Sequence, residues 1–128
     1  MAHLIDTNVA IHVRDGVHEL IDKIEALGGP VLMSIVTRVE LEGGVYREPS
    51  LSSQRRAALD LMFRAIRVLV FDDEAAGAYA NIVKHAGYSR RKLLDRMIAA
   101  QAIVHRATLV TMNQDDFADI PGLKLLSW

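Results

Sequence analysis

Cysteine is absent from this 128-residue sequence, and aromatic residues are scarce: there are three phenylalanines, three tyrosines and one tryptophan. Without cysteine the chain can form neither a disulfide framework nor a thiolate metal site, which fits a reducing cytoplasm. The few aromatic side chains leave little surface for stacking single-stranded bases. The formal net charge of −1 argues against a basic coat that would bind nucleic acid over the whole surface.

Long apolar runs are missing as well. No stretch approaches the ~20 apolar residues of a membrane span, and Asp6 interrupts the N-terminus before the core of a signal peptide could form. With 51% hydrophobic and 24% charged residues, the composition is typical of a globular protein that buries a core. We therefore expect a single domain over residues 1–128, located in the cytoplasm and not in a membrane.

Short apolar segments alternate along the chain with segments of helical periodicity. The apolar segments predict strands at residues 3–5, 31–33, 68–71, 108–111 and 124–126. The periodic segments predict helices over 17–27, from Ser34 through TRVELEGGV, over 53–66, from Asp72 or Asp73 to His85, and over 92–106. This alternation predicts an α/β fold with a mainly parallel sheet that is covered by helices on both faces.

Acidic residues follow or lie near several of these strands. Asp6 follows the first strand, Glu40 lies in the helix after the second, and Asp95 is in the first turn of helix 92–106. Asp115 and Asp116 come shortly after strand 108–111. Because functional groups collect beyond the carboxyl ends of parallel strands, four segments can bring an acid to the same edge of the sheet.

Each acid also has a purely structural explanation. Asp6 could cap a helix, Asp95 could favour the first turn of its own helix, and Glu40 could face solvent. Asp115 and Asp116 could simply occupy a loop. These readings weaken when they are combined, because Asp6 and Asp95 both border segments that should be buried.

Acids that converge need something to offset their repulsion. Two carboxylates ~5 Å apart repel by roughly 3 kcal/mol at an effective dielectric of ~20, which is large beside a domain stability of ~5–15 kcal/mol. A cluster therefore requires protonation, basic partners or a divalent cation. Oxygen ligands suit Mg²⁺ or Mn²⁺, and such ions activate water for attack on a phosphodiester. The hypothesis is a metal-dependent phosphodiesterase.

Other chemistries find less support. The five histidines show no paired zinc spacing, no glycine-rich phosphate loop is present, and no serine lies in a nucleophile elbow. An aspartyl-phosphate enzyme that uses Asp6 as nucleophile normally needs a second acid two residues later, and Asn8 stands at that position.

Four segments resemble, in order, the motifs of PIN-domain ribonucleases, and in particular those of VapC-type toxins from bacterial type II toxin–antitoxin pairs. They are LIDTNV, TRVELEGGV, LLDRMIAAQA and TLVTMNQDDF, and the terminal IPGLKLLSW is similar as well. The resemblance covers nearly the whole chain. It implies a three-layer α/β/α sandwich and an endoribonuclease that depends on Mg²⁺ or Mn²⁺.

The resemblance also implies roles for individual residues. Four carboxylates would bind metal and carry catalysis: Asp6, Glu40, Asp95 and Asp116. Four polar residues would support them: Thr7, Asn8, Thr111 and Asn113. Asp116 is preferred to Asp115 because the family's acid directly precedes an aromatic residue, here Phe117. Glu42 is excluded on geometry, because two residues along a helix from Glu40 it points to a different side.

The partners implied by the resemblance are an RNA substrate, such as tRNA or ribosomal RNA, a VapB-like antitoxin and a second copy of the chain in a homodimer. One position departs from the family pattern: Arg96 stands after the third acid, where a small or apolar residue is usual. With Arg90, Arg91 and Lys92 it is a candidate contact for RNA phosphates. Alternatively Arg96 pairs with Asp95 and weakens metal binding, which would leave a module that binds RNA or a partner without cutting.

Overall fold

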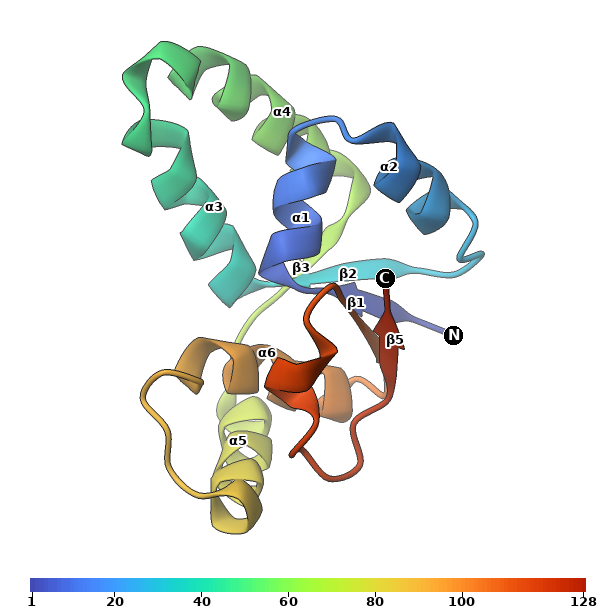
Figure 1. The fold of residues 1–128 in the computed structure, drawn as a ribbon, viewed down its shortest axis with the longest axis vertical. Helices are drawn as coiled ribbons and strands as arrows, with labels where there is room; N and C mark the ends of the chain where they lie inside the picture. The colour runs from blue at the N-terminus through green and yellow to red at the C-terminus, as the bar shows by residue number, and fades with distance from the viewer.

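A five-stranded, fully parallel sheet forms the centre of the computed structural model, which describes all residues 1–128 (Figure 1). The strands are β1 (His3–Ile5), β2 (Val31–Ser34), β3 (Arg67–Leu69), β4 (Thr108–Thr111) and β5 (Leu125–Ser127). Their order across the sheet is β3-β2-β1-β4-β5. All five predicted strands are confirmed, with bounds that shift by one or two residues except at β1 and β4.

Six α-helices connect the strands. They are α1 (Thr7–Arg14), α2 (His18–Glu25), α3 (Ile35–Arg47), α4 (Ser52–Ala65), α5 (Asp73–Ala86) and α6 (Leu93–Val104). Short 3₁₀ turns add η1 (Pro49–Leu51) and η2 (Gln114–Phe117), which the periodicity did not predict. The predicted caps are present, since the Ser34 hydroxyl accepts from the Val36 N–H and Asp72 accepts from the Ala75 N–H.

The helices form two layers, one on each face of the sheet (Figure 1). Because successive strand residues point to opposite faces, Leu4 packs into a core with α5 and α6, whereas Ile5 packs into a second core with α1, α3 and α4. Strands that are apolar on both faces are typical of a parallel sheet covered on both sides. The predicted α/β/α sandwich is confirmed.

The strand order reverses at β1, and this reversal locates the site. β1 pairs with β2 on one side and with β4 on the other, so that Ile5 lies opposite both Met33 and Val110. The segments that leave the carboxyl ends of β1 and β4 therefore diverge from neighbouring positions and open a crevice between the two halves of the fold. Asp6 is the first residue beyond the end of β1.

A buried polar link fixes α6 against the sheet on the side of this crevice. The Gln101 side chain accepts a hydrogen bond from the Ser34 hydroxyl and donates to the Leu69 and Val70 carbonyls at 3.1 and 2.9 Å. Gln101 is fully buried, so these bonds satisfy a polar group that would otherwise be costly to enclose. The second half of α6 is thereby bonded to the carboxyl ends of β2 and β3. None of the helices has the length and apolar character to cross a membrane.

Candidate active site

Asp6 is the most deeply buried acid of the crevice, with 4% of its surface exposed. One carboxylate oxygen accepts from the Val9 N–H at 3.0 Å and caps α1, and the other accepts from the Thr111 hydroxyl at 2.6 Å. Burial raises the pKa of Asp6 above its usual range, and the negative charges of Asp116 and Glu40 raise it further, although the two hydrogen bonds oppose this. Asp6 therefore caps a helix and also belongs to a group of acids.

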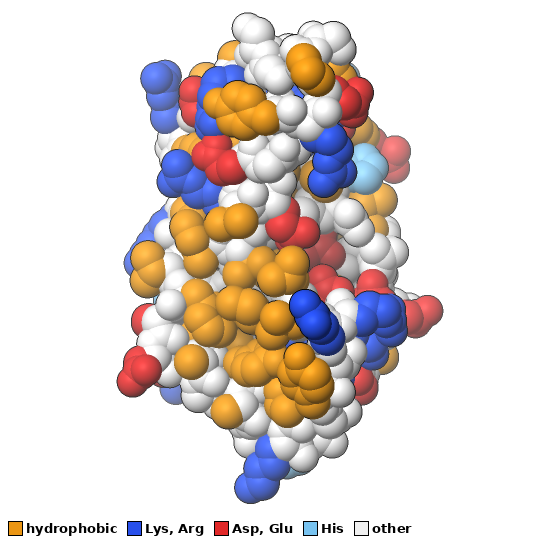
Figure 2. All heavy atoms as spheres, turned by 90° about the vertical axis from the view of Figure 1, so that its left-hand side faces the viewer, with side chains coloured by type: hydrophobic (Ala, Val, Ile, Leu, Met, Phe, Trp, Pro, Cys, Tyr) orange, Lys and Arg blue, Asp and Glu red, His pale blue; other side chains and the backbone are white.

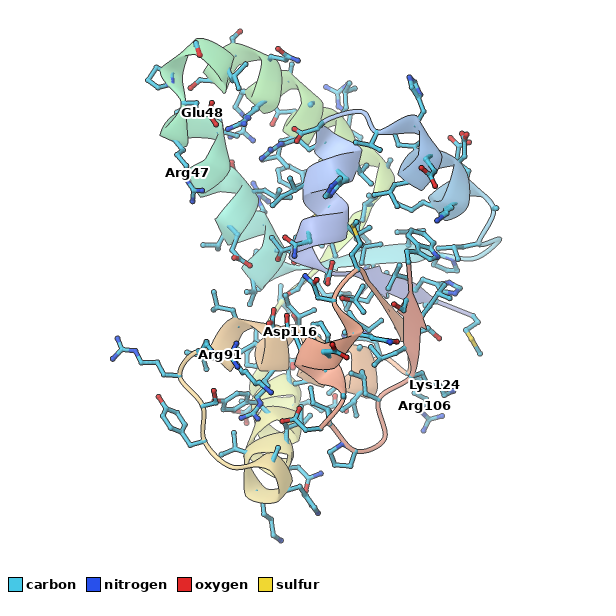
Figure 3. The ribbon with its side chains drawn as sticks, viewed as in Figure 1. Arg47, Glu48, Arg91, Arg106, Asp116 and Lys124 are labelled. Carbon is cyan, nitrogen blue, oxygen red and sulfur yellow. The ribbon has the colours of Figure 1, made fainter.

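A cleft of about 530 Å³ opens at this edge of the sheet. All four predicted acids line it: Asp6, Glu40, Asp95 and Asp116. Its wall contains only two hydrophobic residues, Ile11 and Phe117. Figure 3 shows Asp116 facing the opening between the two helical layers, and Figure 2 shows acidic side chains gathered in a hollow there.

The pKa of Asp95 is raised by burial and by the charges of all three other acids. Burial, and after it the charges of Asp116, Asp6 and Glu40, raise the pKa of Asp95 to about 6, although Arg91 acts in the opposite direction. Asp95 therefore lies within electrostatic range of the other three carboxylates. Asp115, by contrast, is exposed and does not line the cleft, so that the structure brings Asp116 and not Asp115 to the other acids.

Glu40 is held by a short chain of hydroxyl groups. Thr7 donates to Glu40 Oε1 at 2.8 Å, and its oxygen lies 3.0 Å from the hydroxyl of the buried Thr37, which can donate to it in turn. Glu42 lies elsewhere, as predicted: it pairs with Arg56 at 2.5 Å and with Arg38 at 3.8 Å. Sequence reasoning missed Thr37, whose only signal is its position one helical turn before Glu40.

The other three predicted polar residues are also at the cleft. Thr111, in addition to its bond to Asp6, accepts from the Asn113 N–H at 3.0 Å and so fixes the start of the loop that carries Asp116. Asn8 and Asn113 also line the cleft. Hydrogen bonds thus define the orientation of two of the four carboxylates, Asp6 and Glu40.

The model of the PIN domain family matches residues 3–123. The chain belongs to the PIN-domain family. It is 30% identical to "Ribonuclease VapC1" of Rickettsia felis, over 99% of this chain and 96% of that protein. It is 25% identical to "Ribonuclease VapC2" of the same organism, over 100% of this chain and 98% of that protein. The resemblance to VapC-type members is confirmed.

The fold of this PIN domain also matches solved structures along its whole length. The crystal structure of VapBC2 from Rickettsia felis, bound to a DNA fragment from its promoter, superposes with a TM-score of 0.87 at 24% identity. The match covers 100% of this chain and 99% of that one. At this identity the superposition establishes the fold of the PIN domain and no more.

The position of Arg96 in this PIN domain contradicts its predicted role. It was a candidate RNA contact, yet only 2% of it is exposed, and it does not pair with Asp95. Its guanidinium donates to the Gly87 carbonyl at 2.5 Å and to Asp119 at 3.1 Å. A cation enclosed in this way supports the fold and cannot reach a phosphate. Lys92 also bonds Asp119, at 3.3 Å, whereas Arg90 and Arg91 are exposed.

A basic wall faces the acids across the cleft of the PIN domain, and sequence reasoning did not predict it. It consists of Arg14 on α1, Arg47 at the end of α3 and Arg55 on α4. The sequence did indicate that Arg47 could reach the cleft, because residues 40, 44 and 47 lie on one face of a helix. Arg14 and Arg55 come from other helices, and only the packing of α1 against α3 and α4 brings them together.

The acidic side chains of the cleft do not converge on a single point in this structure. No three acids or histidines are placed so that they could bind the same metal ion. The donor set nevertheless suits a hard divalent cation, because it consists of carboxylate oxygens with no basic side chain hydrogen-bonded to them, and the pKa values of Asp6 and Asp95 are raised. Such an ion would take one or two carboxylates directly and complete its shell with water, which is how proteins commonly hold Mg²⁺.

Proposed function

We propose that this PIN domain is a metal-dependent endoribonuclease and acts as the toxin of a toxin–antitoxin pair. The observation that carries the proposal is the cleft itself, where one carboxylate directly after β1 and three from α3, α6 and η2 repel one another without a bonded cation. The curated relatives named ribonuclease VapC support the reaction class. Mg²⁺ or Mn²⁺ would lower the pKa of a water molecule and offset charge on the phosphodiester.

The residues of the chain would supply orientation. Asp6, fixed by Thr111 and by the Val9 N–H, and Glu40, fixed by Thr7, would each present an oxygen to the cation without losing side-chain freedom on binding. Asp95 and Asp116 would complete the acidic group. Asn8 and Asn113 offer amide groups that can orient water or a phosphate oxygen from the rim of the cleft.

The partners would be a VapB-like antitoxin, an RNA such as tRNA or ribosomal RNA, and a second copy of the chain, all in the cytoplasm. An antitoxin is supported by the solved neighbours, which are named as VapBC complexes. It could block the cleft by placing an arginine against the carboxylates.

A homodimer is supported by an apolar patch beside the cleft, lined by Ile35, Val39, Leu94 and Met97 of α3 and α6. Figure 2 shows a broad hydrophobic surface next to the acidic hollow. Contiguous exposed apolar surface of this kind marks an interface.

The competing function, a module that binds without cutting, loses its motivation in the structure. It depended on Arg96 neutralising Asp95, and Arg96 instead pairs with Asp119.

The test uses two adjacent acids as a matched pair. Purified protein is incubated with total tRNA and ribosomal RNA, with Mg²⁺, with Mn²⁺ or with chelator, beside Asp116→Asn and Asp115→Asn. We expect cleavage by the wild type and by Asp115→Asn, and a loss of at least about 100-fold for Asp116→Asn. Equal cleavage by both variants, or cleavage that persists in chelator, would refute the proposal.

A further inference from the structure

Two of the arginines around the cleft are already bound within the chain. Arg14 Nε donates to Asp15 Oδ1 at 3.0 Å, and only 6% of the Arg14 side chain is exposed. Arg55 donates to the Gly44 carbonyl at 2.9 Å and to Glu48 Oε1 at 3.2 Å. Arg55 thereby links α4 to the end of α3, and a ligand could use its guanidinium only by breaking these bonds. The Arg14 bond is local to the end of α1, and burial keeps that side chain from most contact with a ligand.

Arg47 and Arg91 are different. Both side chains are exposed, and neither guanidinium group makes a hydrogen bond or an ion pair within the chain. Arg47 lines the cleft from the end of α3, and Arg91, in the loop before α6, is close enough to Asp95 to lower its pKa. Figure 3 shows Arg47 above the opening and Arg91 below it, beside Asp116. The free cations thus stand at opposite ends of the acidic group.

Charge explains why a polyanion would need them. The cleft is lined by six carboxylates and three guanidinium groups: Asp6, Asp15, Glu40, Glu48, Asp95 and Asp116 against Arg14, Arg47 and Arg55. A cation among the acids can offset the charge of the reacting phosphate, but the neighbouring phosphates lie beyond it and meet a negative field. Unpaired arginines bind such phosphates well, because their planar fork matches two phosphate oxygens.

The cleft also lacks the means to read bases by stacking. Phe117 is its only aromatic residue, and 2% of Phe117 is exposed. No aromatic face is therefore available to a base inside the cleft. Stacking therefore contributes little there, and contacts to the phosphate backbone gain in importance.

We propose that Arg47 and Arg91 bind the RNA phosphates on the two sides of the scissile phosphate and so position the strand across the four carboxylates. This inference rests on the proposed function and specifies how its substrate is held. Both are positioning residues, and the contacts they make are independent of base identity. The same two side chains serve any sequence that can enter the cleft as a single strand.

The test measures binding, not cleavage. Fluorescence anisotropy of a short labelled oligouridylate is recorded in Mg²⁺ over a range of salt concentrations, with all variants built on Asp116→Asn so that the RNA stays intact. The variants are Arg47→Gln, Arg91→Gln and, as the matched control, Arg106→Gln. Arg106 is exposed and unpaired like the other two, but it lies away from the cleft (Figure 3).

We expect Arg47→Gln and Arg91→Gln each to weaken binding several-fold and to reduce the slope of log K against log salt by about 0.7, the value for one phosphate contact on a single strand. Arg106→Gln should change neither quantity, and an oligoadenylate should give the same pattern. A merely structural role would not move the salt slope. Restored slopes in Arg47→Lys and Arg91→Lys would add support.

Slopes that stay unchanged, an equal effect of Arg106→Gln, or no binding of the RNA would each overturn the inference. If the slopes fall as expected while the wild type fails to cut RNA, the phosphate contacts stand and the proposed reaction fails. Binding and cleavage are measured on different proteins, so the two failures are distinguishable.

Discussion

Asp95 makes the folded protein less stable when its carboxylate is ionised and no cation is bound. Burial raises its pKa to about 6, and Asp116, Asp6 and Glu40 contribute to the rise. Because the folded-state pKa exceeds the unfolded value of ~3.9, the folded state binds more protons between these two values. The contribution of Asp95 to the free energy of unfolding is therefore fully present below about pH 4. It is lost as the pH rises through about 6.

Replacing Asp95 by Asn should stabilise the metal-free protein at neutral pH. We expect the free energy of unfolding near pH 8 to rise by about 1–2 kcal/mol, a figure reduced to allow for the partial exposure of the side chain. The gain should disappear below about pH 4. Urea denaturation with chelator across this pH range measures it, and Asp22→Asn, at an exposed site on α2, is the control. Equal or lower stability of Asp95→Asn near pH 8 would contradict the assignment.

Asp6 and Asp95 could be named as candidates from the sequence because each is tied to an element end that periodicity reveals, whereas Glu40 lies inside α3. Asp6 follows a strand whose bounds were predicted without error, and Asp95 lies in the first turn of a strongly periodic helix. Asp116 was harder, because the choice against Asp115 depends on the 3₁₀ turn of η2 and not on periodicity. The choice of Asp116 came from the family resemblance, in which the acid directly precedes an aromatic residue.

At the scale of elements, Arg96 connects three segments that meet beside the site. It lies in α6, donates to the Gly87 carbonyl at the end of α5, and pairs with Asp119 beyond η2. Although partial burial acts in the opposite direction, hydrogen bonds and charge from Lys92 and then Arg96 hold the pKa of Asp119 below its usual range. The pair thus ties the loop that carries Arg91 to the segment that carries Asp116.

Asp119→Asn should weaken this connection with little change of shape. The folded-state pKa of Asp119 is lowered, so its contribution to stability is present above about pH 4 and is lost as the pH falls below that value. We expect a loss of about 1 kcal/mol at neutral pH, because Asp119 is partly exposed to solvent. Thermal denaturation at neutral and acidic pH measures it. A loss of the same size for Asp115→Asn, on the same segment, would show that the pair contributes nothing specific.

Arg96 shows where sequence reasoning about elements fails. Arginine is rarely buried, so periodicity assigns it to an exposed helix face. Its partner is 23 residues away in the chain, and no local pattern links the two. Strands and helices could be predicted because their signals repeat within a few residues, whereas a buried ion pair between distant segments exists only once the chain has folded.

At the scale of the whole molecule, the cleft and the apolar patch share a boundary. Glu40 lines both, since it faces the other acids and also borders the apolar hollow between α3 and α6. Val39 is 64% exposed and Leu94 is 44% exposed, although both are large hydrophobic residues. A second copy that covers this patch would bury them and would place the two clefts of the dimer near the same interface.

Val39→Lys should therefore separate the proposed dimer without affecting the fold of each chain. Because Val39 is exposed in the single chain, the lysine meets water there, but in the dimer it must be desolvated against apolar side chains. We expect dimerisation to weaken by about 30-fold or more, equivalent to about 2 kcal/mol. Light scattering should then report the 14.2 kDa of one chain where the wild type shows twice that mass. Leu61→Lys, at a site on α4 that is 63% exposed and outside the patch, should remain a dimer. A wild type that is monomeric at all concentrations, or a Val39→Lys protein that stays dimeric, would remove α3 and α6 as the dimer interface.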